Sequence, residues 1–128
     1  MTLCAPPRID GTALVLEDAM IVAYDAAAML SEFGARDVVI FGTVDEALQH
    51  IAGGNDISMA LLDINLGDET SLEAAKALRE RAVPILYSTG YDEKSVVMDG
   101  FPEGKILIKP FTDDDFAQAL ISMGFVEA

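Results

Sequence analysis

Charged and polar residues stand directly after four apolar runs of this sequence. The runs are ALVL at 13–16, SMALL at 58–62, PILYS at 84–88 and KILI at 105–108, and they are followed by Glu17 and Asp18, by Asp63, by Thr89 and by Lys109. If the runs are parallel strands, their carboxyl ends meet at one edge of a sheet, where the ligands of such sheets collect. Three carboxylates, a hydroxyl and an ammonium are therefore predicted to converge at that edge.

Three carboxylates so close together predict a bound cation, because they would otherwise repel one another and take up protons. Oxygen ligands suit Mg²⁺, which keeps several waters and adds one or two carboxylates and a phosphate. The chain has one histidine, His50, and one cysteine, Cys4, which make no competing transition-metal set. A Mg²⁺ site beside Lys109 and Thr89 suits a phosphoryl group, and an aspartate can be the nucleophile that accepts it.

The elements that must position these residues alternate between strands and helices. A fifth apolar run, VVIF at 38–41, completes a set of near-continuous apolar stretches, as expected for strands covered on both faces. Between the runs, helical spacing predicts helices at 19–33, 44–52 and 70–81, and a last helix that opens with Thr112 and Asp115 in a capping-box-like start. The pattern predicts an α/β fold, (βα)5, with a doubly wound five-stranded parallel sheet.

Two local expectations concern the fourth and fifth units. Gly100, Pro102 and Gly104 interrupt the stretch 92–104, so we expect only a short or mobile fourth helix there. In the last run, the aliphatic residues Ile106, Leu107 and Ile108 are predicted to form a buried strand.

Composition sets the broad class of the protein. With 128 residues, 52% of them hydrophobic and 23% charged, the chain reads as one folded domain, with residues 1–10 as an N-terminal extension and 11–128 as the domain. The net charge of −14 argues against binding to nucleic acid. No apolar run approaches the roughly 18 residues that cross a bilayer, and the N-terminus lacks a secretion-signal pattern. Together with a lone Cys4, this predicts a cytoplasmic protein without a membrane partner.

The polar motifs, taken in order, resemble the conserved set of response regulator receiver domains. Glu17–Asp18, LLDIN with Asp63, STG with Thr89 and KPF with Lys109 each end a predicted strand, and the resemblance covers essentially the whole chain. It implies a flavodoxin-like sheet with strand order 2-1-3-4-5, a function in two-component or phosphorelay signalling, and a stand-alone receiver without an output domain. The stretch LYSTGY at 86–91 is similar to the Phe-Ala-Thr-Gly pattern of a divergent group of alphaproteobacterial receivers.

The resemblance implies roles for the acidic residues. Asp63 would accept a phosphoryl group from the phosphohistidine of a histidine kinase or a histidine phosphotransfer protein. Mg²⁺ would be ligated by Asp18, Asp63 and the backbone carbonyl of Asn65, while Glu17 acts through water. The chain would catalyse only its own phosphorylation and dephosphorylation, so it is not predicted to be an enzyme that acts on a separate substrate.

The resemblance also implies roles for Thr89 and Lys109, and at one position this chain departs from the pattern of the family. Thr89 would bind a phosphoryl oxygen, and Lys109 would pair with the phosphoryl group ahead of a cis bond to Pro110. Receivers usually place Tyr or Phe where this chain has Ile106, so rotation of that aromatic ring cannot transmit the signal here. We expect instead a population shift in the segment 91–104. The signal would pass to a downstream protein, unless the domain acts as a phosphate sink or shuttle.

Three other functions are compatible with parts of the sequence. A pseudo-receiver, which binds proteins without accepting phosphate, is the main alternative. The stretch IDGTAL at 9–14 resembles a motif of aspartyl-phosphate phosphatases, but the nucleophile position is occupied by Arg8. An FMN-binding flavodoxin-like protein needs a phosphate-binding loop after the first strand, where this chain has the anionic LEDAM. Taken alone, Lys109 could simply extend to solvent, and Glu17–Asp18 could cap a helix.

Overall fold

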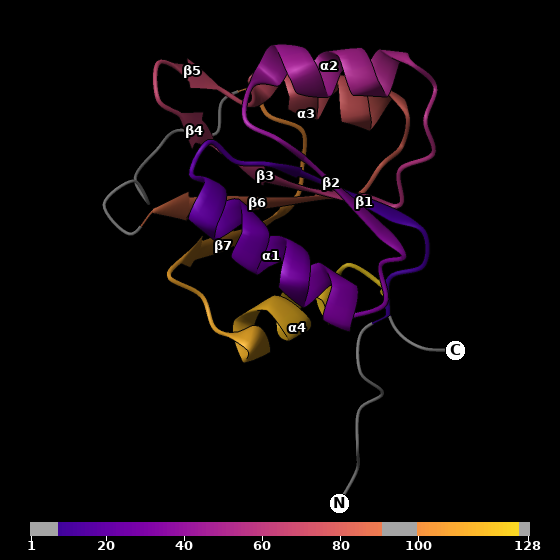
Figure 1. Ribbon diagram of the computed structural model, residues 1–128, viewed down its shortest axis with the longest axis vertical. Coiled ribbons are helices and arrows are strands. Elements are labelled where there is room, and N and C mark those ends of the chain that lie inside the picture. Colours follow the sequence, from indigo (N-terminus) through magenta and orange to yellow (C-terminus); the bar gives the residue numbers. More distant parts are fainter. Residues whose placement is uncertain (1–7, 91–99, 126–128) are drawn as a thin grey trace, which may run out of the picture.

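A five-stranded parallel sheet forms the middle layer of the molecule (Figure 1). The computed structural model describes residues 8–90 and 100–125. Along the sheet the strands follow the order β2-β1-β3-β6-β7, so the predicted order 2-1-3-4-5 is confirmed. Their bounds are Thr12–Leu16 for β1, Asp37–Phe41 for β2, Met59–Asp63 for β3, Ile85–Gly90 for β6 and Lys105–Lys109 for β7.

Helices cover both faces of this sheet, as the doubly wound pattern predicts. In Figure 1, α2 and α3 lie on one face and α1 and α4 on the other. The helices span Met20–Glu32 (α1), Val44–Ala52 (α2), Leu72–Glu80 (α3) and Asp113–Ser122 (α4). The predicted short fourth helix falls mostly on residues 91–99, which lie outside the described residues. None of the helices in the described part of the chain is long and apolar enough to cross a membrane.

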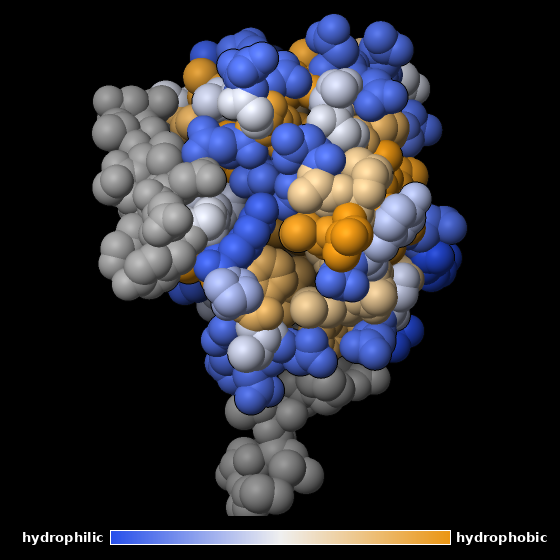
Figure 2. Space-filling model, turned by 60° about the vertical axis from the view of Figure 1, so that its left-hand side comes forward, coloured by the Kyte–Doolittle hydropathy of each residue, from blue (hydrophilic) through white to orange (hydrophobic). Residues whose placement is uncertain are grey.

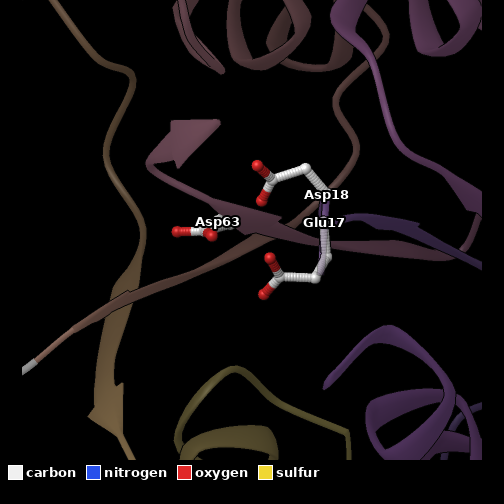
Figure 3. Close-up of side chains that lie close together, drawn as sticks. All are labelled: Glu17, Asp18 and Asp63. Carbon is white, nitrogen blue, oxygen red and sulfur yellow. The ribbon is translucent and has the colours of Figure 1, made fainter. Parts of the chain in front are cut away.

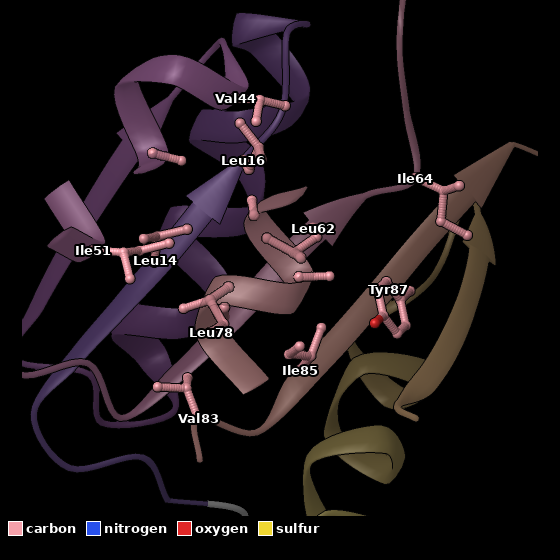
Figure 4. Packing of buried hydrophobic residues seen from close by; sticks show 14 of the residues in the cluster. Leu14, Leu16, Val44, Ile51, Leu62, Ile64, Leu78, Val83, Ile85 and Tyr87 are labelled. Atoms are coloured by element: carbon pink, nitrogen blue, oxygen red, sulfur yellow. The ribbon is translucent and has the colours of Figure 1, made fainter. Parts of the chain in front are cut away.

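Two apolar clusters hold the helices to the sheet. The first lies under α2 and α3 and includes Leu14, Leu62 and Tyr87 (Figure 4). The second lies under α1 and α4 and includes Val15 and Phe116. Side chains of a strand alternate between the two faces, so each central strand supplies both clusters and must be apolar throughout. All five residues of β3 are buried for this reason.

The last strand does not follow the prediction that three successive aliphatic residues are buried. Leu107 is buried under α4, but Ile106 and Ile108 are 45% and 43% exposed. The prediction was wrong because β7 is an edge strand, and within 8–90 and 100–125 only its Leu107 face is packed against a helix. An apolar run in the sequence does not distinguish a central strand from an edge strand.

A two-stranded antiparallel hairpin between β3 and α3 was not predicted. It pairs β4, Asn65–Leu66, with β5, Glu69–Thr70, across a turn at Gly67, whose φ is +72°. A φ in this range suits glycine and strains other residues. The hairpin takes up Thr70, with which the predicted helix 70–81 began, and α3 itself begins two residues later, at Leu72.

The predicted capping box of the last helix is confirmed, and it yields a stability prediction. The Thr112 hydroxyl accepts the N–H of Asp115 at 3.0 Å, and the Asp115 carboxylate accepts the N–H of Thr112 at 3.0 Å. Thr112→Ala leaves one helix N–H without this acceptor, so we expect the free energy of unfolding to fall by about 1 kcal/mol. Thr112→Ser should stay close to the parent in urea unfolding. Equal stability of the alanine variant and the parent would contradict the capping role.

Candidate functional site

Three carboxylates from two adjacent strands meet at the carboxyl edge of the sheet. Glu17 and Asp18 follow β1, and Asp63 ends β3, its neighbour in the sheet. One oxygen from each of the three lies within 4.8 Å of the others. Figure 3 shows the carboxylates of Asp18 and Glu17 on either side of Asp63. Glu17 and Asp63 are only 4% and 6% exposed, whereas Asp18 is exposed, so the group opens to solvent on the side of Asp18.

Lys109 reaches this acidic group from the far edge of the sheet. Its Nζ donates to Glu17 Oε1 at 2.7 Å and to Asp63 Oδ2 at 3.1 Å. The lysine therefore points into the site and does not extend to solvent. The peptide bond between Lys109 and Pro110 is cis, as predicted.

One ammonium does not neutralise the buried carboxylates, and their pKa values reflect this. Burial, and then the hydrogen bond and charge of Glu17, raise the pKa of Asp63 from 3.8 to about 7, while Lys109 offsets only part of the rise. Burial would also raise the pKa of Glu17, but hydrogen bonds with Lys109, Asp63 and the N–H of Ala19 hold it below its usual value. Burial opposes the charge on Lys109, yet its two carboxylate partners raise its pKa above 10.5. Of this buried acidic pair, Asp63 is therefore the residue that takes up a proton near neutral pH.

Thr89 lies near the acidic group but is not bonded to it. It is 3% exposed near the end of β6, and its hydroxyl oxygen has no hydrogen-bond partner among the residues that the structure describes. The preceding residue, Ser88, pairs with Asp63 in the register of β3 and β6. A buried hydroxyl without a partner is uncommon, because it has lost its hydrogen bonds to water without forming one within the protein. It is a donor available to a group that enters the site.

Asn65 and the unpredicted hairpin border the acidic group. The backbone N–H of Asn65 donates to Asp63 Oδ1 at 3.4 Å. At the hairpin turn, a Cβ on Gly67 would lie 3.8 Å from Asp18 Oδ2, so the turn is adjacent to the exposed carboxylate. Glu69, on the other side of the turn, accepts the N–H of Val44 at 3.4 Å and links the hairpin to the start of α2. Sequence reasoning missed Glu69; Gly67 followed by Asp68 was the available turn signal.

The donor set fits a Mg²⁺ ion. Glu17, Asp18 and Asp63 carry three negative charges when ionised, and Lys109 supplies one positive charge. A divalent cation would balance the remainder, and the exposure of Asp18 leaves space for the waters that Mg²⁺ retains. The oxygen-only chemistry of this group and its opening to solvent therefore match the predicted ion.

The phosphatase-like stretch lies at the other end of the sheet. Asp10 precedes the amino end of β1 and pairs with Arg8, at 3.3 Å between Arg8 Nε and Asp10 Oδ1. The three carboxylates lie beyond the carboxyl end of the same strand. Asp10 therefore belongs to no common site with Asp63.

Comparison with known proteins connects this geometry to a family. The chain matches no family model, and no curated protein matches it by sequence. Among solved structures, SdrG from Sphingomonas melonis Fr1 is 30% identical, over 90% of this chain and 96% of that chain, with a TM-score of 0.69. A response regulator receiver protein from Burkholderia phymatum has a TM-score of 0.80 at 20% identity, over 92% of this chain and 98% of that one. The chain belongs to the response regulator receiver domains.

A third similar structure contains a metal ion of its own. The receiver domain of the sensor histidine kinase PA1611 from Pseudomonas aeruginosa PAO1, which has a magnesium ion coordinated in its active site cleft, matches with a TM-score of 0.74. The identity is 21%, over 88% of this chain and 95% of that chain. The fold and family predicted for this receiver are thus confirmed. Its likeness to the Phe-Ala-Thr-Gly group stays a prediction, and Tyr91 of that stretch lies outside the described residues.

The raised pKa of Asp63 predicts how the stability of the metal-free receiver depends on pH. The folded state holds a proton on Asp63 up to about pH 7, while the unfolded chain releases it near pH 3.8. Stability from this group is therefore complete below pH 3.8 and is lost as the pH rises through 7. With a chelator present, we expect the free energy of unfolding to fall by on the order of 2 kcal/mol between about pH 5.5 and pH 8.

Asp63→Asn is the control for this measurement, because it cannot titrate. Its free energy of unfolding should stay nearly constant over the same range in urea titrations. A parent protein whose stability is flat or rises with pH there would show that Asp63 is ionised in the metal-free fold.

Proposed function

We propose that this receiver accepts a phosphoryl group on Asp63 from the phosphohistidine of a histidine kinase or a histidine phosphotransfer protein. The observation that supports the proposal most directly is the placement of the Asp63 carboxylate between two further carboxylates and the Lys109 ammonium. This group combines a nucleophile, ligands for a divalent cation and a cation for the phosphoryl oxygens. Transfer between histidine and aspartate requires these three elements.

The reaction begins with a carboxylate oxygen of Asp63. Its lone pair attacks phosphorus, a P–O bond forms, and the P–N bond to the donor imidazole breaks. The electron pair of that bond returns to the imidazole nitrogen, which takes a proton from solvent. The N–H of Asn65 on Oδ1 and the Nζ of Lys109 on Oδ2 fix the orientation of the attacking carboxylate. Asp63 must be ionised to attack, so its proton has to leave first.

Lys109 and Thr89 would then hold the transferred group. Lys109 Nζ, which already contacts Asp63, is placed to pair with an oxygen of a phosphoryl group on that residue. Thr89 has a buried hydroxyl that can donate to a second oxygen. An unpartnered buried donor costs roughly 1–3 kcal/mol, and bonding to the phosphoryl group would remove that cost.

Mg²⁺ would be held by Asp18, Asp63 and the backbone carbonyl of Asn65, with Glu17 acting through water. The ion would supply positive charge to the phosphoryl oxygens and keep Asp63 ionised by competing with its proton. Glu17, which already bonds to Lys109, would keep that lysine in the site.

The start of α1 is the surface on which the phosphodonor would dock. Met20, Ile21 and Tyr24 are 43%, 80% and 64% exposed, and α1 begins two residues after Asp18. Figure 2 shows hydrophobic side chains gathered on this face among hydrophilic ones. Next to α1 is a hollow of about 200 Å³, lined mainly by apolar groups of α1 and of residues 109–111. A helix that presents a phosphohistidine to Asp63 would cover this surface.

The phosphorylated receiver would signal through a second protein or pass the phosphoryl group on. In either case it would act on no substrate beyond its own Asp63. The cytoplasmic location stays a prediction within this proposal.

Direct labelling tests the proposal. With Mg²⁺ and acetyl phosphate, we expect the intact mass to show one added phosphoryl group that is lost in base. Asp63→Asn should remain unlabelled, because an amide is not a nucleophile for phosphorus. Asp37→Asn, an exposed aspartate on β2, is the matched control and should be labelled like the parent. A parent protein that never takes up phosphate would favour the pseudo-receiver, which only binds other proteins.

The docking surface has a separate test. Ile21→Asp places a charge in the centre of the apolar patch, so we expect transfer from a phosphorylated histidine phosphotransfer protein to slow by about tenfold or more. Labelling by acetyl phosphate should be unchanged, because this small donor needs no docking surface. Gln49→Asp adds the same charge on the opposite face of the sheet and should leave both rates unaltered. If Ile21→Asp slowed phosphoryl transfer from the histidine phosphotransfer protein and from acetyl phosphate equally, the substitution would act on the acidic site and not on docking.

A further inference from the structure

Tyr87 is a fully buried side chain whose polar atom bonds to a different part of the chain. Its hydroxyl donates to the backbone carbonyl of Pro102 at 2.7 Å, and its ring packs edge to face against Phe101, at 5.7 Å between ring centroids. A Cβ on Gly104 would lie 2.7 Å from Cε2 of the same ring. One side chain thus contacts three of the four residues in the segment 101–104. Figure 4 shows it in the apolar cluster near Ile85 and Ile64.

The hydroxyl of Tyr87 remains a hydrogen-bond donor at physiological pH. Burial raises its pKa to about 12, so it stays protonated at any physiological pH. Its bond to Pro102 is short and partly buried, and loss of the donor would leave the half-buried carbonyl of Pro102 without this partner.

Tyr87 lies between the acidic site and the segment 101–104. It is two residues before Thr89 in β6, so both side chains project from the same face of the sheet. The segment 101–104 leads directly into β7, which ends with Lys109. Tyr87 therefore holds the entry of β7 against β6, while Thr89 and Lys109 stand at the other end of the same strand pair.

We propose that Tyr87 is a positioning residue that couples the phosphoryl-holding pair, Thr89 and Lys109, to the segment 101–104. The inference rests on the proposed function. A phosphoryl group held by Thr89 and Lys109 joins β6 and β7 at their carboxyl ends, and the Tyr87–Pro102 bond joins them at the entry of β7. Both restrain the same pair of strands, so each reduces the entropy that the other must remove. The coupling is positive, and it acts equally in both directions.

Besides the backbone pairing of β6 with β7, the Tyr87–Pro102 bond is the one side-chain hydrogen bond shown between β6 and the segment 101–104 among the described residues. Ile106, which pairs with Tyr87 in the register of β6 and β7, has no polar side-chain atom and is half exposed. The coupling therefore depends on the tyrosine hydroxyl and on its acceptor in the segment 101–104.

Tyr87→Phe tests this inference, because it removes the hydroxyl and retains the ring. With Mg²⁺ present, we expect the variant to bind beryllium fluoride, a phosphoryl mimic, at least about fivefold more weakly than the parent. In the parent, binding should slow amide exchange at residues 100–107, and in Tyr87→Phe this slowing should be smaller. Ser122→Ala is the matched control: it removes a hydroxyl that donates to a backbone carbonyl at 2.8 Å in α4, and should bind like the parent.

The possible outcomes distinguish a failure of the Tyr87 coupling from a failure of the proposed function. If Tyr87→Phe melts at a lower temperature but binds beryllium fluoride as tightly as the parent, Tyr87 is structural only and the coupling is refuted. A parent protein that does not bind the mimic would overturn the proposed function, and the coupling with it. Phe101→Leu, which loosens the same segment without altering the buried tyrosine, provides a second variant. It should weaken binding in the same direction, and unchanged binding in a folded Phe101→Leu would also count against the coupling.

Discussion

The site depends on one ammonium shared between two buried carboxylates. Lys109 Nζ lies 2.7 Å from Glu17 and 3.1 Å from Asp63, and neither of these two acidic residues is more than 6% exposed. Buried charges are stable only when they are paired, so without Lys109 this arrangement would leave two carboxylates repelling each other. With Lys109, one negative charge of the pair remains unbalanced, and Asp18 adds another. That imbalance raises the pKa of Asp63 and creates the affinity for a divalent cation.

The parallel sheet is what brings these charges together. Glu17, Asp63 and Lys109 are far apart in the sequence, but the strand order places them at one edge, because parallel strands end on the same side. This much could be predicted, since each residue directly follows an apolar run and the runs alternate with helical segments. Of the predicted residues, Glu17, Asp18, Asp63 and Lys109 meet as one group. Thr89 lies at the same edge with its hydroxyl unpaired among the described residues, and the carbonyl role of Asn65 stays a prediction.

The remaining features depend on contacts that local patterns do not encode. The hairpin of β4 and β5 is two residues long on each side, too short for a periodic signal, and it displaces the start of α3. Ile106 and Ile108 are apolar like central-strand residues, yet their strand is at the edge. The Tyr87–Pro102 bond joins residues 15 apart through a crossover, so it becomes visible only in three dimensions. The sequence shows that residue 106 is not aromatic, but it does not show that Tyr87, which pairs with Ile106 in the register of β6 and β7, is buried beside it.

The charge imbalance at Asp63 can be measured by a site-resolved carbon-13 titration of its carboxyl group, first with Mg²⁺ removed and then with Mg²⁺ at saturation. Without metal, the pKa of Asp63 should be about 7, raised by burial and by Glu17. With Mg²⁺ bound, the pKa should fall far below that value, because the cation competes with the proton for the same oxygens. A metal-free pKa near 3.8 that Mg²⁺ does not change would contradict the claim that unbalanced negative charge defines this site.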